Sequence, residues 1–288
     1  MSGDEPVTQA RPSNWRRSGA YLIVLLGAVW TLAPLYWMFI TAFKSWEEVV
    51  GSETPTLLPN AWSLSGFEQA LGYGAQGIAD SAIVALGTAV LSLVLGVPAA
   101  YSFSRFRTGG RNLAFAVLMV RFMPPVAFTA AVYLIAVRLG LLDTHALLIL
   151  VNSLFNVPFV VWIMKGFFDE IPYAIEEAAY VDGAGWLRAM RDHVLPLAKP
   201  GLVAVGCFVT IFAWNELLFA TILTGRHVIP FTRVVPGLQM GRKYLLLNNW
   251  PAACALGVLN VVVVILISFY IQRYLVRAMT YGAVWGGD

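Results

Sequence analysis

Two ionisable residues lie inside otherwise apolar stretches of the chain and are the strongest candidates for chemistry. Glu216 directly follows Trp214 and Asn215, and Arg121 lies alone in a second stretch. An indole face can stack on the C–H groups of a sugar ring while the amide and the carboxylate bond its hydroxyls. The same groups could instead hold neighbouring helices together. The candidate residues of a solute pathway are Trp214, Asn215, Glu216, Arg121, Asn152 and Asn156.

Arg121 is open to three interpretations. Its guanidinium could neutralise Glu216, or it could lie in a broken helix near the pathway, because Met123, Pro124 and Pro125 follow it. A long basic side chain can also extend along its helix to the headgroups at the cytoplasmic end of a membrane span. The residue types alone leave the three alternatives open.

Motifs of catalysis and of metal binding are missing from the sequence. The chain has no G-x-x-x-x-G-K-[ST] phosphate loop, no H-E-x-x-H and no G-x-S-x-G, and its three histidines lack metal-ligand spacing. Cys207 and Cys254 lie in long apolar runs, which indicates buried thiols. No basic run interleaved with aromatic residues suggests nucleic-acid binding. We therefore expect a protein that is not an enzyme and binds no metal, cofactor or nucleic acid itself.

The composition requires much of the chain to lie in a membrane. Of the 288 residues, 59% are hydrophobic and 12% are charged, whereas a soluble domain carries about 25% charged residues. A water-soluble fold of this length cannot bury so many apolar side chains. The excess must face lipid, which indicates a polytopic membrane protein.

Six apolar stretches are each long enough to cross a bilayer as a helix, which takes about 20 residues. Four of them contain no Lys, Arg, Asp or Glu, whereas the third contains only Arg121 and the fifth only Glu216. The stretches are continuous and not alternating, which favours helices over a β-barrel. We predict an all-α fold with six transmembrane helices at residues 18–43, 81–104, 112–137, 144–164, 200–225 and 247–272.

Basic residues predict the orientation of these helices, because Lys and Arg are retained on the cytoplasmic side. With both termini inside, twelve Lys and Arg lie in cytoplasmic segments and six in external ones. We predict a cytoplasmic tail at 1–17 and a transmembrane domain at 18–288, of which 273–288 form a second cytoplasmic tail. The external segment 44–80 is long and aromatic, which suits either a folded cap or docking surface, or an interfacial aromatic belt with a connector.

The cytoplasmic loop at 165–199 is the most informative stretch of the chain. It begins with apolar and acidic residues at helical spacing, and Gly183 and Gly185 then break this first helix. A second amphipathic stretch begins at Trp186 and is expected to end at Pro196. The unit could be a solvated linker, but an apolar face in the cytoplasm favours contact with a partner protein.

This loop contains a Glu-Ala-Ala sequence, a glycine four residues later and a distal Leu-Pro pair. Together they resemble the EAA motif of permease subunits of bacterial ATP-binding-cassette (ABC) importers. The motif precedes the penultimate predicted span, as in that family, and His193 departs from it where an aliphatic residue is usual. The resemblance implies that the loop seats on a cytoplasmic ATPase and that the glycine permits its turn. The residues implied in ATPase coupling are Glu177, Ala178, Ala179, Asp182, Gly183, Leu195 and Pro196.

The resemblance covers nearly the whole chain and narrows to the carbohydrate-import branch. The chain is similar to the shorter permease of the maltose-transporter type at residues 34–45, 157–172 and 212–220. Residues 279–284 are similar to that family's C-terminal pattern, although Trp285 lies where a lysine is common. The implied solute is a sugar or an oligosaccharide, and the alternative is a related solute such as glycerol phosphate or a polyol.

The resemblance further implies one subunit of a larger assembly in the bacterial inner membrane. The implied partners are a second homologous permease, two copies of a cytoplasmic ABC ATPase that bind ATP and Mg, an extracytoplasmic substrate-binding protein, and membrane lipid. Closure of the ATPases would move the helices between inward-open and outward-open states. A self-contained secondary carrier is a weaker alternative, because it would need internal repeats and several intramembrane charges.

Overall fold

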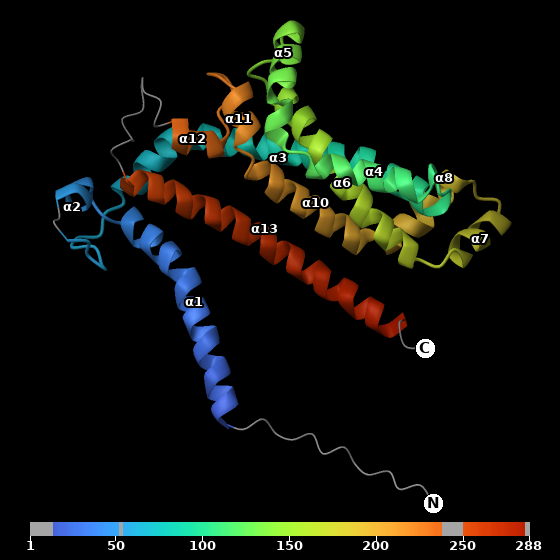
Figure 1. Ribbon diagram of the computed structural model, residues 1–288, viewed down its shortest axis with the longest axis horizontal. Coiled ribbons are helices and arrows are strands. Elements are labelled where there is room, and N and C mark those ends of the chain that lie inside the picture. The colour runs from blue at the N-terminus through green and yellow to red at the C-terminus, as the bar shows by residue number, and fades with distance from the viewer. Residues whose placement is uncertain (1–13, 52–53, 238–249, 286–288) are drawn as a thin grey trace, which may run out of the picture.

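The computed structural model describes residues 14–51, 54–237 and 250–285, and in these ranges the chain is helical and contains no strand (Figure 1). η1 is a 3-10 helix and η2 is a π-helix. The elements in chain order are α1 (Asn14–Ala42), α2 (Trp46–Gly51), α3 (Ser65–Arg105), α4 (Gly110–Phe122), η1 (Pro125–Phe128), α5 (Thr129–Leu139), α6 (His145–Glu170), α7 (Ala174–Val181), α8 (Trp186–Ala189), η2 (Met190–Val194), α9 (Leu195–Leu197), α10 (Lys199–Trp214), α11 (Leu218–Leu223), α12 (Phe231–Gly237) and α13 (Trp250–Trp285). The predicted all-α fold is confirmed.

In the described parts of the chain, four helices are individually long and apolar enough to cross a membrane, and two bent pairs raise the number to six if each pair is one span. The four are Tyr21–Ala42, Gly74–Arg105, His145–Glu170 and Trp250–Tyr270. The bent pairs are Asn112–Phe122 with Val126–Leu139, and Trp186–Leu197 with Lys199–Trp214. The prediction of a polytopic helical membrane protein agrees with this arrangement, and the orientation of the termini stays a prediction.

Two predicted spans are interrupted, and in the third the interruption agrees with the alternative of a broken helix after Arg121. The third, predicted at 112–137, bends by 87° between α4 and α5. Pro124 and Pro125 lie at this bend, and proline cannot continue a helical hydrogen-bond ladder. The fifth, predicted at 200–225, is helical in α10 only to Trp214, and α11 begins at Leu218. Both breaks border the pocket described below.

Among the helices that extend beyond their predicted bounds, α3, α6 and α13 do so by the largest margins. α3 begins at Ser65, inside the segment 44–80 that was expected to be a loop. α6 continues to Glu170 and α13 to Trp285, so part of the predicted loop 165–199 and most of the predicted tail are helical. Residues 1–13 of the first predicted tail and 247–249 of the sixth span lie outside the described residues.

Packing explains why α3 is longer than its sequence pattern indicates. α3 packs against α6, α10, α13 and α12, which makes it the central helix of the bundle (Figure 1). Near its start, a Cβ atom on Gly77 would lie 2.8 Å from Val234 Cγ2 of α12. The glycines of this segment resemble a loop in composition, but here glycine permits close helix packing, and tertiary contacts override a poor helix propensity.

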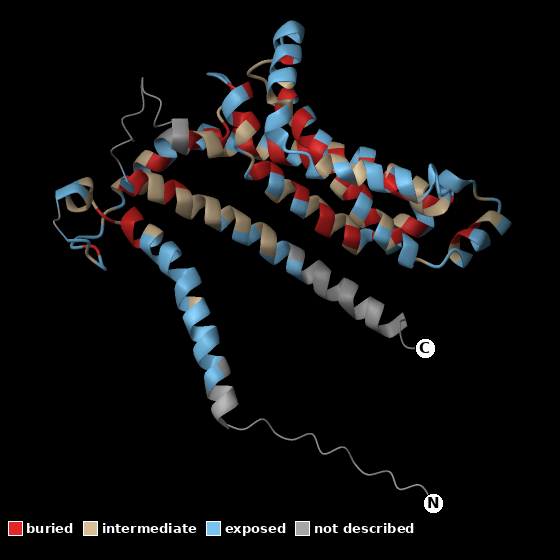
Figure 2. Cartoon of the chain, viewed as in Figure 1, coloured by how far each residue is buried: buried red, intermediate tan, exposed pale blue. Residues whose placement is uncertain are grey.

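Most of the described part of α1 is exposed and appears pale blue in Figure 2, while the buried residues lie mainly in the central helices. Trp30 is 85% exposed and Val24 is 68% exposed. Apolar side chains at such exposure need lipid or another membrane helix to cover them. This burial pattern fits a membrane subunit.

The segment after α1 is folded around Glu48. The Glu48 carboxylate accepts hydrogen bonds from Thr56 Oγ1 at 2.9 Å and from the Asn60 backbone N–H at 3.0 Å. The rings of Phe43 and Trp62 pack with their centroids 5.4 Å apart. Of the two alternatives for this segment, these contacts favour the folded cap.

Candidate functional site

The predicted coupling loop contains the two-turn helix α7, which ends in a glycine turn. The Gly183 N–H donates to Tyr180 O at 3.0 Å and the Ala184 N–H to Ala179 O at 2.9 Å, which is the hydrogen-bond pattern of a Schellman motif. Gly183 has φ +80°, a conformation that glycine adopts without a Cβ clash. The predicted helix and its glycine turn are confirmed.

The second half of the loop is helical, but it does not end where predicted. α8, the π-helix η2 and α9 follow one another, and α10 begins at Lys199. The expected end at Pro196 is wrong, because Pro196 lies in the first turn of α9, where a missing N–H breaks no hydrogen bond. His193 is exposed, so this departure from the motif leaves the packing undisturbed. Leu195 packs against the core formed by α3, α6 and α10.

The motif residues of α7 divide between an exposed and a buried side. Ala179 is 3% exposed, whereas Val181 is 87% exposed. A contiguous exposed surface of this kind, with apolar side chains beside two carboxylates, is typical of a contact with a partner protein. We call the following exposed residues the α7 surface: Glu177, Ala178, Val181, Asp182, Gly183, Trp186 and Leu187.

Sequence reasoning missed the residue that fixes the buried side of α7. Glu176 is fully buried and pairs with Arg105, the last residue of α3, at 2.5 Å between Oε1 and Nε. A usable signal was present, because Glu176 precedes the buried Ala179 by three residues and therefore lies on the same helix face. The adjacent glutamates thus differ in burial: Glu176 is buried and Glu177 is exposed.

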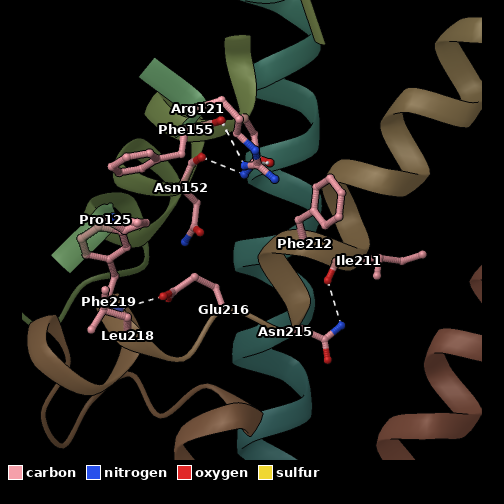
Figure 3. Close-up of a pocket in the computed structure, with 11 residues that line it drawn as sticks. Arg121, Pro125, Asn152, Phe155, Ile211, Phe212, Asn215, Glu216, Leu218 and Phe219 are labelled. Atoms are coloured by element: carbon pink, nitrogen blue, oxygen red, sulfur yellow. Dashed lines mark hydrogen bonds between the residues drawn. The ribbon is translucent and has the colours of Figure 1, made fainter. Parts of the chain in front are cut away.

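A pocket of about 330 Å³ lies where the two bent spans meet α6 (Figure 3). Its volume is within the range of small-molecule sites, about 300–1,000 Å³. It brings together five of the six predicted pathway residues with aromatic and aliphatic side chains. The lining residues are Arg121, Pro125, Asn152, Phe155, Asn156, Ile211, Phe212, Asn215, Glu216, Leu218 and Phe219.

Arg121 lies at the break of the third span, which is the second of its three predicted alternatives. Its Nη1 donates to Phe155 O at 3.1 Å and to Asn156 Oδ1 at 3.2 Å. The guanidinium carbon lies 4.9 Å from the ring centroid of Phe212, a cation–π contact. The predicted neutralisation of Glu216 is not seen, because no ion pair joins the two residues in the part of the chain that the structure describes.

Glu216 caps a short helix across the pocket from Arg121. Its carboxylate accepts from the backbone N–H groups of Phe219 at 2.8 Å and Ala220 at 3.0 Å, at the start of α11 (Figure 3). A carboxylate at a helix N-terminus satisfies amides that would otherwise lack a partner. Both alternatives for this residue, a structural role and a place in the pathway, therefore have support.

Trp214 is the pathway candidate that the structure removes from the pocket. The residue is 4% exposed, its Nε1 donates to Asn260 Oδ1 at 2.6 Å, and its ring stacks on Phe231. The expected stacking of this indole on a sugar is therefore contradicted, because its faces are covered by the protein. Asn215 is exposed and its Nδ2 donates to Ile211 O at 2.9 Å.

The two asparagines of α6 face the pocket from one side of the helix. Asn152 Nδ2 donates to Leu148 O at 2.9 Å and Asn156 Nδ2 to Asn152 O at 2.8 Å. These two Nδ2 bonds stay within α6, whereas Asn156 Oδ1 accepts from Arg121 of α4 at 3.2 Å, so Asn156 also makes a bond between helices. Among the described residues, no group of His, Cys, Asp and Glu is arranged to hold a metal ion.

At the end of the bundle away from α7, Asp143 organises the segment between α11 and α12. Its carboxylate accepts hydrogen bonds from four consecutive backbone N–H groups, at 2.7 Å from Gly225, 2.7 Å from Arg226, 2.9 Å from His227 and 3.0 Å from Val228. Burial by itself raises the pKa of Asp143, but the four donors outweigh it and lower this pKa to about 2. The carboxylate is therefore charged at neutral pH and holds this loop.

Comparison with protein families identifies the chain's relatives. The family model described as "Binding-protein-dependent transport system inner membrane component" matches residues 92–281. The probable ABC transporter permease protein y4oR of Sinorhizobium fredii is 34% identical over 260 residues, which are 88% of this chain and 90% of that protein. The trehalose transport system permease protein SugB of Mycobacterium tuberculosis is 30% identical over 94% of this chain and 99% of its own length.

A second group of comparisons extends this result to another named sugar permease and to solved structures. The diacetylchitobiose uptake system permease protein NgcG of Streptomyces coelicolor is 31% identical over 96% of this chain and 92% of its own length. A chain in the crystal structure of a bacterial ABC transporter involved in alginate import has a TM-score of 0.76 at 24% identity, covering 93% of this chain and 99% of that chain. The fold is therefore shared with a solved ABC transporter subunit.

Proposed function

Because the chain belongs to the family of binding-protein-dependent transport system inner membrane components, we propose that it is the sugar-import permease that receives ATP-driven movement through the α7 surface. The family is a membrane component of ABC importers and not a family of enzymes. The chain is accordingly an inner-membrane transport subunit. The proposal concerns its solute, its coupling surface and its orientation, with both termini and α7 in the cytoplasm.

The observation that carries the coupling role is the α7 surface itself. Val181 is 87% exposed at the end of a two-turn helix whose other side is fully buried at Glu176. A helix that is anchored on one side and apolar on the other suits a cleft in a partner protein. We propose that the partner is a cytoplasmic ABC ATPase, present in two copies that bind the ATP and Mg. A second permease would complete the pathway, and a substrate-binding protein would deliver the solute.

A sugar is the solute that the pocket and the relatives favour together. Trehalose and diacetylchitobiose are named for two relatives that align over nearly their whole length. The pocket offers amides from Asn152 and Asn156 and the exposed ring of Phe212, and sugars are bound by this combination of hydrogen bonds and ring faces. An anionic polyol such as glycerol phosphate is the second candidate, because Arg121 has no carboxylate partner among the described residues.

Co-purification tests the assembly and the α7 surface in one experiment. From detergent-solubilised native membranes, the tagged chain is expected to recover an ATPase and a second permease, identified by mass spectrometry. A Val181→Asp variant should lose most of the ATPase while retaining the second permease, because a carboxylate would be buried at the contact without a partner. The matched Val181→Leu variant keeps the surface apolar and should recover both. A chain that purifies alone and stays folded would overturn the proposal and favour a self-contained carrier.

Replacing Arg121 is expected to lower uptake and to separate the two solute classes. In the reconstituted importer, Arg121→Gln should lower uptake of trehalose or diacetylchitobiose about tenfold, since one charge-assisted hydrogen bond contributes at least about 1.5 kcal/mol. The control is Arg138→Gln, the same substitution at an exposed position of α5 outside the pocket. A different result would identify the anionic solute instead: the unmodified importer takes up glycerol phosphate but no sugar, and Arg121→Gln lowers the uptake of glycerol phosphate. Unchanged uptake of every probe would remove Arg121 from the pathway.

A further inference from the structure

A buried ion pair joins α7 to the central helix of the bundle. Arg105 is the last residue of α3, and its side chain is 8% exposed, while the side chain of Glu176 is 0% exposed. Arg105 Nε donates to Glu176 Oε1 at 2.5 Å, and Arg105 Nη2 donates to Ile171 O at 2.9 Å. The pair therefore ties α7 and the end of α6 to the same side chain of α3.

Two tyrosines complete the bonding of the Glu176 carboxylate. Tyr101, one helical turn before Arg105 on α3, donates from its hydroxyl to Glu176 Oε2, and Tyr180 donates to the same oxygen at 3.4 Å. The Tyr101 ring packs edge-on against Phe168 of α6 with centroids 5.8 Å apart. Both oxygens of the Glu176 carboxylate thus accept hydrogen bonds. Tyr101, one of the two donors from α3, is itself packed against α6.

Such a cluster contributes more to position than to stability. Apolar residues can often replace a buried ion pair with no loss of stability, so its presence does not by itself indicate a stabilising role. A fully bonded network does fix the relative orientation of the groups that form it. α7 has 8 residues, which is too short for an isolated helix to hold its own shape. Its orientation must come from its contacts.

The backbone connections of α7 are poorly suited to transmit a push. On one side, Ile171 to Tyr173 separate it from α6, and on the other, the glycine turn at Gly183 separates it from α8. Neither connection continues a helix, so each can bend through its backbone angles. The side-chain cluster instead links α7 directly to α3, which packs against α6, α10, α12 and α13.

We propose that Glu176, Arg105 and Tyr101 form a positioning joint that makes α7 and α3 move as one body when the ATPase moves α7. This inference rests on the proposed function, because it assumes that the α7 surface contacts the ATPase. Glu176 and Glu177 then have separate tasks. Glu177 belongs to the exposed contact surface, and the buried Glu176 in the same helix turn transmits the movement to α3.

The test measures the solute transported per ATP hydrolysed by the complete importer in proteoliposomes. Glu176→Gln keeps the size of the side chain but removes the charge that Arg105 and Tyr101 recognise. It should retain ATPase recovery and ATP hydrolysis, while the solute transported per ATP falls at least about fivefold, the lower end of typical coupling between sites. Arg105→Gln should lower the same ratio, and the double variant should be no worse than either single variant, because all three break one joint.

The control is Glu177→Gln, the same substitution one residue along the chain. At this exposed position the substitution should weaken ATPase recovery. In the complex that remains, the solute transported per ATP should be unchanged. If Glu176→Gln does not accumulate in the membrane, Tyr101→Phe removes a single hydrogen bond of the joint and should lower the ratio in the same direction. An unchanged ratio in the variant that folds would overturn the joint. Failure of the unmodified chain to recover any ATPase would instead overturn the proposed function.

Discussion

A Gly183→Leu variant is expected to reach the membrane with its bundle intact and to lose at least about nine-tenths of transport, a loss equivalent to about 1.4 kcal/mol at the coupling contact. Gly183 has φ +80°, and a Cβ there would meet no atom of the chain within 4 Å. The added side chain therefore cannot disturb the core and must extend from the α7 surface. A left-handed conformation costs an ordinary residue roughly 1–2 kcal/mol, so the turn after α7 would also be distorted.

Uptake and ATPase recovery, measured on equal amounts of membrane-inserted chain, test this prediction. Gly183→Asn is the matched control for backbone strain, because asparagine tolerates the left-handed conformation. Gly183→Ala adds that backbone strain with little bulk, so its uptake should lie between those of Gly183→Asn and Gly183→Leu. Leucine should reduce both uptake and ATPase recovery most, while the second permease stays bound. Normal uptake by the leucine variant would show that the glycine turn does not face the ATPase.

The helices could be predicted from sequence wherever one physical property decides them. Continuous apolar stretches of about 20 residues required membrane helices, and α1, α6 and α13 lie where such stretches predict them. A broken helix near Pro125 was one of the alternatives that the prolines suggested, whereas the break near Asn215 was missed, because hydropathy counts apolar residues and is insensitive to an interruption of the helix. The early start of α3 depends on its packing against α12 and α13, which no local pattern contains.

The candidate site divides in the same way. The turn at Gly183 follows from local backbone chemistry and was predicted, whereas the inward direction of Glu176 depends on Arg105, 71 positions away. The pocket brings together Arg121, Asn152, Asn156, Asn215 and Glu216, whose place in a solute pathway stays a prediction. Trp214 was placed wrongly, because adjacent residues at a helix end point in different directions and Asn260 binds its indole. Residue type indicates which chemistry is possible, but side-chain direction decides where it occurs.

Replacing Asp143 with alanine is expected to destabilise the chain by about 3 kcal/mol. The carboxylate accepts four backbone hydrogen bonds from residues 225–228, and hydrogen bonds to charged groups contribute about 1.5–3 kcal/mol each without being additive. Asp143 also has φ +61°, where alanine is strained and asparagine is tolerated. Asp143→Asn keeps the backbone conformation but removes the charge and replaces one acceptor oxygen with an NH2 donor, and Asp143→Gly removes both the carboxylate and the strain. All three variants should lower the thermal midpoint in detergent, with alanine lowest.

The pH dependence of the Asp143 effect distinguishes the charge from the shape of this side chain. The folded-state pKa of Asp143 is lowered from 3.8 to about 2, because four backbone donors outweigh the opposing effect of burial. The unfolded chain therefore binds the proton more readily, and stability from this group is fully present above the ordinary pKa and is lost as the pH falls toward 2. The difference in thermal midpoint between the unmodified chain and Asp143→Asn should stay constant from pH 7 to about pH 5 and shrink below about pH 4. A difference that persists undiminished at low pH would mean that the side chain acts through packing, since only the ionised carboxylate can accept all four bonds.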